Sequence, residues 1–271
     1  MWRVDLPPNR NGTEDHRRDR WFITKLADLG ADAAEAGGSD SDDRRFFHAP
    51  DVVQSYDDFG RFDGLLIQSG NRADPNETVV QNALFYLKDR EVLTGSAAVR
   101  VENDVSVPPG RYQMSDLHDQ TLCIDGTEEV SEGGRTVACA DRRTERGWYI
   151  HFGQAGEKGL STPLTDGGRV LASTYTPGES SNCAAGRGRG NLYVVQLRSG
   201  AAVANTVRHY ELGEGIPAAP VPVADAIFIP GGGIDLYDLD RDGTRDTAQL
   251  LPSHASKLYR IYWREPGADP L

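Results

Sequence analysis

Three stretches of the sequence repeat the same order of short segments, and this repeat constrains the fold more than any other feature. Each repeat begins with a proline-marked segment, continues with an apolar segment and ends with an aromatic one. In that order the segments are FFHAPDVV (46–53), DGLLIQSGN (63–71) and ALFYLKD (83–89); GLSTPLT (159–165), GRVLASTYT (168–176) and NLYVVQL (191–197); and GIPAAPVPV (215–223), DAIFIPGGG (225–233) and KLYRIYW (257–263). Short β-rich runs between Gly, Pro and Asp turns are typical of antiparallel strands.

The length of the repeated unit indicates an architecture. From its proline to its aromatic segment a unit runs for roughly 30 to 40 residues, which is typical of a β-propeller blade of three or four strands. Each blade hides a sheet face on its neighbour and is not stable alone. We therefore predict an all-β chain that forms a partial β-propeller of about three blades. A β-sandwich with accidental similarity between its segments is the alternative.

Three parts of the chain do not fit the repeat. The opening MWRVDL looks like an isolated third element, so we expect residues 1–6 to form an orphan strand and the chain to be a fragment. On this interpretation, the lack of an apolar signal segment at the start says nothing about compartment. We expect insertions at about 26–43, an acidic surface loop, and at 104–146, where no blade element is recognisable.

Charge and hydropathy argue against two classes of protein, those that bind nucleic acid and those that cross a membrane with a helix. The formal net charge is −12, which argues against a nucleic-acid ligand because phosphate binding needs a surplus of Lys and Arg. No run approaches the roughly 20 apolar residues of a membrane-spanning helix. The sequence favours an extracellular surface or one that binds cations.

Two of the three cysteines have a spacing that suits a hairpin. Cys123 and Cys139 flank a polar, Gly-containing turn between two short apolar pieces. We predict a hairpin closed by a disulfide, worth about 3 kcal/mol for a loop of roughly 15 residues. Two reduced thiols are the alternative, and Cys183 has no evident partner.

A candidate metal site lies near the C-terminus. The sequence DLYDLDRDGTRD (235–246) contains the pattern D-x-D-x-D-G-x-x-D. Ca²⁺ takes six to eight oxygen ligands, and alternate Asp residues on a tight turn bring several to one point. A neutral Gln249 stands where an EF-hand has its bidentate Glu, and the upstream AIFIP is strand-like, so we predict an EF-hand-like loop between strands. A solvated acidic loop is the alternative. The predicted Ca²⁺ ligands are Asp238, Asp240, Asp242, Asp246 and the Thr244 carbonyl.

No other motif indicates catalysis. The acidic stretches GSDSDD (38–43) and SYDDFGRFDG (55–64) lack ligand spacing, and we interpret both as solvated loops. GRGRG (186–190) does not lead from a strand into a helix, as a phosphate loop must, so we interpret it as a turn. The six His show no metal-ligand spacing, and no Ser/His/Asp set or G-x-S-x-G is present. We predict that the chain is not an enzyme.

Several of these segments, in order along nearly the whole chain, resemble the C-terminal β-propeller of the PilC/PilY family of type IV pilus proteins. The segments that carry the resemblance are DDRRFFHAPDVV, DGLLIQSGNRADP, NALFYLKD, GWYIHF, EKGLSTPLT, GRGNLYVVQL and YRIYWREP. The opening WRVDL resembles the strand that follows GDLxGNL in that family. The Cys123–Cys139 segment departs from the family pattern.

The resemblance implies a non-enzymatic, calcium-responsive module at the pilus tip or outer membrane. It implies support of pilus extension, twitching motility and adhesion, with pilins or minor pilins and a host or surface ligand as partners. The family's familiar calcium loop precedes the GDLxGNL strand, so only the motif, not its position, carries over to 238–246. A propeller enzyme with a quinone cofactor and a purely structural propeller are the alternatives. The quinone enzymes use an adjacent Cys-Cys disulfide, and this sequence has no adjacent cysteines.

Overall fold

The computed structural model describes residues 1–5, 22–30, 39–90, 112–124, 129–132, 135–139, 145–178, 188–203, 207–223, 226–228 and 250–252. Strands dominate these residues, and helical structure among them is limited to the 3-10 turns η2 (Asp40–Asp42) and η3 (Met114–Asp116) and to Cys139. The predicted all-β class is confirmed.

The first sheet has five strands in the order β4-β5-β6-β11-β8. Neighbours are antiparallel except β11 and β8, which are parallel. Its strands are β4 (Asp51–Asp57), β5 (Gly60–Gln68), β6 (Ala83–Asp89), β11 (Gly147–His151) and β8 (His118–Asp119).

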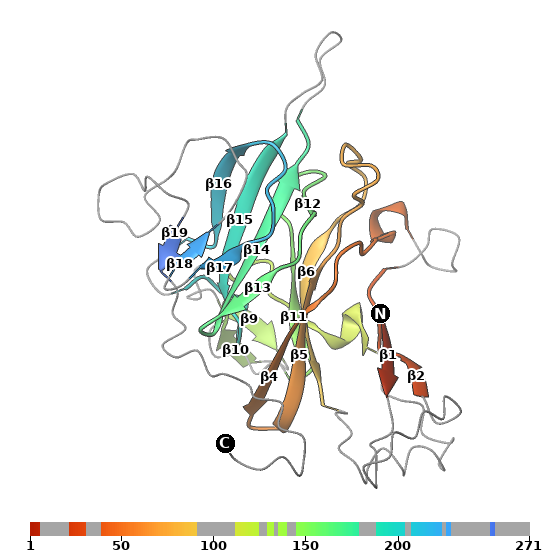
Figure 1. Ribbon diagram of the computed structural model, residues 1–271. Helices are drawn as coiled ribbons and strands as arrows, with labels where there is room; N and C mark the ends of the chain where they lie inside the picture. The colour runs from red at the N-terminus through yellow and green to blue at the C-terminus, as the bar shows by residue number, and fades with distance from the viewer. Residues whose placement is uncertain are drawn as a thin grey trace, which may run out of the picture.

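The second sheet is antiparallel throughout, in the order β12-β14-β15-β16, and β13 also pairs with β14. Figure 1 shows it in green to blue beside the orange and yellow strands of the first sheet. Its strands are β12 (Lys158–Gly159), β13 (Leu164–Asp166), β14 (Arg169–Thr176), β15 (Arg189–Gln196) and β16 (His209–Glu214).

Smaller sheets complete the described structure. The third sheet is antiparallel, in the order β17-β18-β19, and three further pairs are β1 with β2, β9 with β10, and β3 with β7. Their bounds are β1 (Trp2–Asp5), β2 (Phe22–Lys25), β3 (Ala27–Asp28), β7 (Tyr112–Gln113), β9 (Glu129–Glu132), β10 (Arg135–Ala138), β17 (Val221–Val223), β18 (Ala226–Phe228) and β19 (Leu250–Pro252).

The predicted repeat corresponds to consecutive, hydrogen-bonded strands. The three elements of the first unit become β4, β5 and β6, and those of the second become β13, β14 and β15. The first two elements of the third unit become β17 and β18, while KLYRIYW (257–263) lies outside the described residues. Within the described part of the chain no barrel or propeller ring closes, so the structure gives no blade count.

The central strands of both main sheets are buried on both faces. One apolar cluster, which includes Leu84, Trp148 and Tyr193, joins the first sheet to the second. A second cluster covers the other face of the first sheet with Leu26 and Tyr112, and a third forms on the far face of the second sheet. Every residue of β6 is buried, which explains why its sequence, ALFYLKD, does not alternate between apolar and polar residues.

Two predicted surface loops take a different form. Residues 26–43 were expected to form an exposed insertion, but Leu26, Ala27 and Leu29 are buried in the second cluster. The prediction missed them because LADLG is too short to show a strand period amid acidic and small residues. SYDDFGRFDG (55–64) is not a solvated loop, because most of it lies in β4 and β5 and only its tip is a turn.

Candidate functional site

The predicted calcium ligands Asp238, Asp240, Asp242, Thr244 and Asp246 lie outside the described residues. In the part of the chain that the structure does describe, no group of three or more His, Cys, Asp or Glu side chains is placed to hold a metal ion. The calcium site therefore stays a prediction from the sequence.

The described residues instead form a cavity of about 530 Å³ between the first and second sheets. The tip of the β4–β5 hairpin, the end of β6, the β13–β14 turn and the residues after β15 line it. Its walls are aromatic and charged: they include Asp57, Phe59, Phe62, Tyr86, Lys88 and Arg198. Cavities of this size that combine apolar walls with a few convergent polar groups are typical of small-ligand sites.

An ion-pair triad forms one side of the cavity. The Asp57 Oδ2 atom accepts hydrogen bonds from Lys88 Nζ at 2.9 Å and from Arg90 Nη2 at 2.6 Å, and Oδ1 accepts from the Phe59 amide at 2.9 Å. Both cations also lie about 5 Å from the centre of the Phe62 ring, in the range of cation–π attraction.

The pKa values of this triad reflect burial and pairing together. Burial alone would raise the pKa of Asp57, but hydrogen bonds from Arg90, Lys88 and the Phe59 amide lower it to about 2. Burial lowers the pKa of Lys88, because the attraction of the Asp57 carboxylate does not fully offset the hydration energy that the ammonium loses. Burial, and then the nearby Asp57 charge, raise the pKa of Tyr86, so its hydroxyl stays protonated.

Gly64 makes room for the Tyr86 side chain on the floor of the cavity. A Cβ atom at Gly64 would lie 2.7 Å from the Tyr86 hydroxyl oxygen and 2.8 Å from a ring carbon. Such distances are too short for a side chain, so only glycine lets the ring lie across β5. The Tyr86 hydroxyl can therefore reach the side of the cavity formed by β4.

The triad predicts a loss of stability in acid. The pKa of Asp57 is lower in the folded state than its ordinary value. Its ionised carboxylate therefore adds fully to the free energy of unfolding above about pH 4, and this contribution is lost as the pH falls toward 2. The shift corresponds to ~2 kcal/mol. Urea unfolding between pH 5 and 2 should show that Asp57→Asn is less stable than the parent at pH 5 and that the difference closes at pH 2. Asp58→Asn is the matched control and should keep the parent's acid dependence; a parallel loss in Asp57→Asn and parent would contradict the prediction.

At the other end of the interface, buried polar groups fix the two sheets together. Gln68 Nε2 on β5 donates to the Ser161 carbonyl at 2.7 Å and to the Ser173 carbonyl at 3.0 Å. A Cβ atom at Gly159 would lie 2.3 Å from the Gln68 side chain, so glycine is needed for this approach. Buried Glu157 accepts hydrogen bonds from Tyr193 and other side chains of the second sheet. The Gln68 contacts join β5 of the first sheet to the second sheet, and the Glu157 contacts lie within the second sheet.

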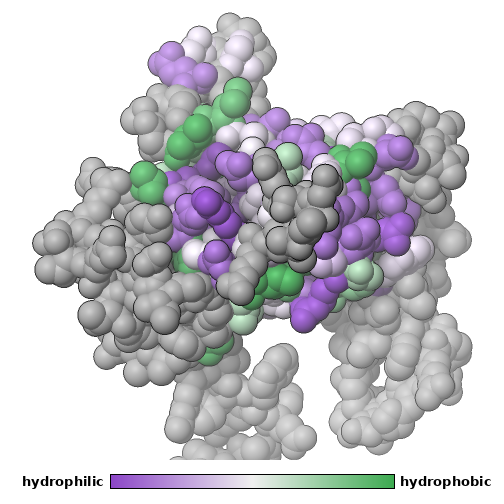
Figure 2. All heavy atoms as spheres, turned by 90° about the horizontal axis from the view of Figure 1, so that it is seen from above, coloured by the Kyte–Doolittle hydropathy of each residue, from purple (hydrophilic) through white to green (hydrophobic). Residues whose placement is uncertain are grey.

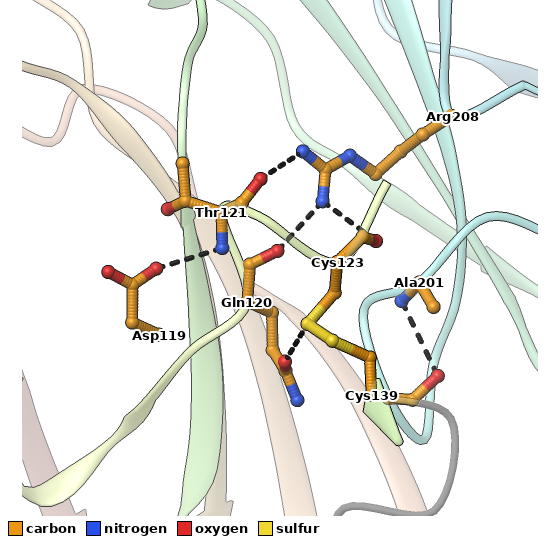
Figure 3. Close-up of a disulfide and its surroundings, with 8 residues drawn as sticks. Asp119, Gln120, Thr121, Cys123, Cys139, Ala201 and Arg208 are labelled. Carbon is orange, nitrogen blue, oxygen red and sulfur yellow. Dashed lines mark hydrogen bonds between the residues drawn. A yellow bond between two sulfur atoms is a disulfide. The ribbon is translucent and has the colours of Figure 1, made fainter. Parts of the chain in front are cut away.

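The predicted disulfide is present, between Cys123 and Cys139, with the Cα atoms 5.6 Å apart. Its hairpin is β9 paired with β10, as the sequence predicted. Figure 3 shows the Arg208 guanidinium pointing at the same segment, where it donates to the carbonyls of Gln120, Thr121 and Cys123 at 2.6 to 3.1 Å. Because Arg208 immediately precedes β16, the disulfide segment is tied to the second sheet.

The disulfide was predicted from the sequence, whereas the cavity was not. Its signal was available in ALFYLKDR (83–90), where Lys88 and Arg90 follow a continuous apolar run. A cation at the end of a buried strand needs a counter-ion, and SYDDFG supplies it across the sheet. The described His residues fit no shared site: burial lowers the pKa of both His48 and His151.

The surface and the helices give two further findings. On the face shown in Figure 2 the coloured residues are mostly hydrophilic, and the hydrophobic ones form separate spots. Within the residues that the structure places, no helix has the length and apolar character needed to cross a membrane.

Comparison with known proteins gives one local similarity. The chain is 46% identical over 69 residues to a Xylella fastidiosa (strain Temecula1 / ATCC 700964) protein described as a type IV pilus biogenesis factor PilY1 homolog. The match covers 24% of this chain and 5% of that protein, so it concerns a small part of the relative's length. No family model and no solved structure matches the chain.

Proposed function

We propose that this chain is a β-propeller part of a cell-surface protein that takes part in type IV pilus biogenesis. The observation that carries the proposal is the 46% identity over 69 residues to a type IV pilus biogenesis factor PilY1 homolog. That relative is described as a biogenesis factor and not as an enzyme, and the cavity residues supply no nucleophile paired with a base. A binding and assembly role therefore fits better than catalysis.

The arrangement of the sheets supports the propeller. In each of the two main sheets one repeat unit supplies three consecutive antiparallel strands, and the central strands of both sheets are buried on both faces. Antiparallel sheets commonly leave one face to solvent, whereas a propeller blade has a neighbour on each side. A sandwich of only two sheets would leave the outer faces of both without an apolar cluster.

The disulfide supports export from the cytoplasm. Disulfides persist in oxidising compartments such as the periplasm and the cell surface and are rare in cytosolic proteins. Cys123 and Cys139 are both fully buried, so the bond is a structural one. Pilins or minor pilins at the pilus tip, and a surface ligand for adhesion, are the partners that this proposal implies.

The pilus role is tested in the source bacterium by deleting the coding sequence for residues 1–271. We expect loss of surface pili in electron micrographs and loss of twitching, both restored when the sequence is returned with an epitope tag. An immunoblot for the tag controls for the level of the returned protein. Normal piliation and twitching after the deletion would refute the role.

We also propose that the loop 238–246 binds one Ca²⁺ through Asp238, Asp240, Asp242, Asp246 and the Thr244 carbonyl. Without a Glu at the twelfth position the site lacks a bidentate arm, so the Kd should lie at about 10⁻⁵ to 10⁻³ M, which suits extracellular calcium. Mg²⁺ should compete poorly because it requires a tighter octahedral shell.

Calcium binding predicts a melting temperature that rises with Ca²⁺ concentration. In Asp240→Ala this rise should disappear, while the metal-free melt stays unchanged or increases slightly because repulsion between carboxylates is relieved. Asp40→Ala, in the other acidic stretch, is the matched control and should keep the full response. If calcium stabilises Asp240→Ala as much as the parent, this loop is not the site.

A further inference from the structure

The cavity between the first and second sheets contains polar groups that the protein leaves without enough partners. Lys88 is 5% exposed, and its ammonium carries three N–H donors. Among the described residues, Asp57 is the single oxygen acceptor for this ammonium, at 2.9 Å. Buried ammonium groups normally have their donors satisfied, so Lys88 has capacity for oxygen atoms of a ligand.

Two hydroxyl groups lie on the same face of the first sheet as Lys88. Tyr86 is 1% exposed, lines the cavity and forms no hydrogen bond with a described residue through its hydroxyl. Ser55 also lines the cavity, opposite Phe62 in the register of β4 and β5. The side-chain hydroxyls of Ser55 on β4 and Tyr86 on β6 and the Lys88 ammonium, also on β6, therefore face one space.

The charges around the cavity select the charge of its ligand. Two cations, Lys88 and Arg90, share the single carboxylate of Asp57, which leaves a local surplus of one positive charge in a chain with a net charge of −12. One negative charge on the ligand balances this surplus. A dianion such as phosphate would exceed this surplus, and the Asp57 carboxylate beside Lys88 would repel it more strongly than a monoanion.

The shape of the cavity mouth indicates a ring. Phe59 is 47% exposed, and together with Phe62 it adds apolar surface next to the donors. A saccharide ring presents C–H groups to an aromatic surface and hydroxyl groups to side chains such as Tyr86 and Ser55. An acidic side chain of a peptide would balance the positive charge but would leave the hydroxyls of Tyr86 and Ser55 without hydrogen-bond partners.

We propose that this cavity binds a monocarboxylated sugar, of the uronic acid or sialic acid class, with its carboxylate on Lys88 and its hydroxyls on Tyr86 and Ser55. Lys88 donates a charge-assisted hydrogen bond to the carboxylate while it keeps its bond to Asp57. The ring packs against Phe59 at the mouth. This site is independent of a role in pili and of the proposed calcium loop.

The test is titration of the full 271-residue chain, in metal-free buffer, with methyl glucuronide, N-acetylneuraminic acid, methyl glucoside and acetate. Isothermal titration calorimetry and saturation-transfer NMR give affinity and contact. We expect one of the two acidic sugars to bind at least about tenfold more tightly than methyl glucoside, the matched neutral sugar, and than acetate, which lacks the ring. Equal affinity for glucoside and glucuronide, or no saturable binding of either acidic sugar in the millimolar range, overturns the proposal, as does binding of acetate as tight as that of the acidic sugars.

Two variants connect the binding to the cavity. Lys88→Met should weaken the binding of the acidic sugar by about tenfold or more and remove the preference for it over methyl glucoside. Tyr86→Phe removes one oxygen atom that accepts or donates no hydrogen bond among the described residues, so it should weaken binding several-fold and leave the urea unfolding curve unchanged. Lys25→Met, in β2 and away from the cavity, is the matched control and should bind like the parent. Unchanged affinity in both Lys88→Met and Tyr86→Phe would refute the site even if the sugar binds elsewhere.

Discussion

Replacing Trp148 with alanine is expected to lower the free energy of unfolding by about 4 kcal/mol, because it empties the centre of the interface between the two main sheets. Trp148 is completely buried, packs 5.6 Å from Tyr86 between ring centroids, and belongs to the cluster that joins the sheets. Its Nε1 atom donates to the Leu197 carbonyl at 2.9 Å, so the substitution also leaves that carbonyl without its partner.

Urea unfolding of the parent and of three variants measures this effect. Trp2→Ala is the matched control, since Trp2 is 65% exposed and the same substitution there should change stability by about 0.5 kcal/mol or less. Trp148→Phe should fall between parent and Trp148→Ala, because part of the ring volume stays. Similar stability losses at positions 2 and 148 would show that the two sheets do not share this core.

Replacing Cys139 with serine is expected to cost about 3 kcal/mol, since the bond closes a loop with a sequence separation of 16 residues. The loss should be visible as a lower urea midpoint, and reduction of the parent should reproduce it. Cys183→Ser is the matched control and should leave the midpoint unchanged.

Thiol labelling gives an independent test of the same bond. Under native, non-reducing conditions at most Cys183 should react with a maleimide, and after reduction and unfolding all three cysteines should react. Labelling of all three thiols in the unreduced protein would rule out the Cys123–Cys139 pair in solution.

The two stability predictions, the acid-stability prediction and the sugar titration concern one structural unit. The first sheet, the second sheet and the disulfide segment meet around Trp148, Tyr86 and Arg208. A protein that unfolds at this interface would also lose the cavity. For this reason Tyr86→Phe, which removes no hydrogen bond to a described residue, is the most informative single substitution for ligand binding.

The sequence by itself determined the strands of the repeat and their order. The signals are local: a proline at the start of a unit, turn residues between segments, and a continuous apolar run such as ALFYLKD. Each repeat segment that the structure describes contains the strand predicted for it. The Cys123–Cys139 hairpin was also predictable, because its two cysteines are close in sequence and flank a turn. The calcium ligands Asp238, Asp240, Asp242, Thr244 and Asp246 come from the same kind of local pattern and stay a prediction.

Only the tertiary structure decided which polar residues meet. Asp57 and Lys88 are 31 residues apart, and nothing in the spacing of SYDDFG and ALFYLKD shows that β4 and β6 lie on either side of β5 with these side chains on one face. The register of the strands sets that face, since a shift of one residue would turn Lys88 to the opposite side. Leu26 and Leu29 are buried for a similar reason: their acidic surroundings predict exposure, but a long-range apolar cluster with Phe85 and Tyr112 outweighs the local composition. Burial and pairing depend on contacts between distant segments, and a local pattern carries no information about them.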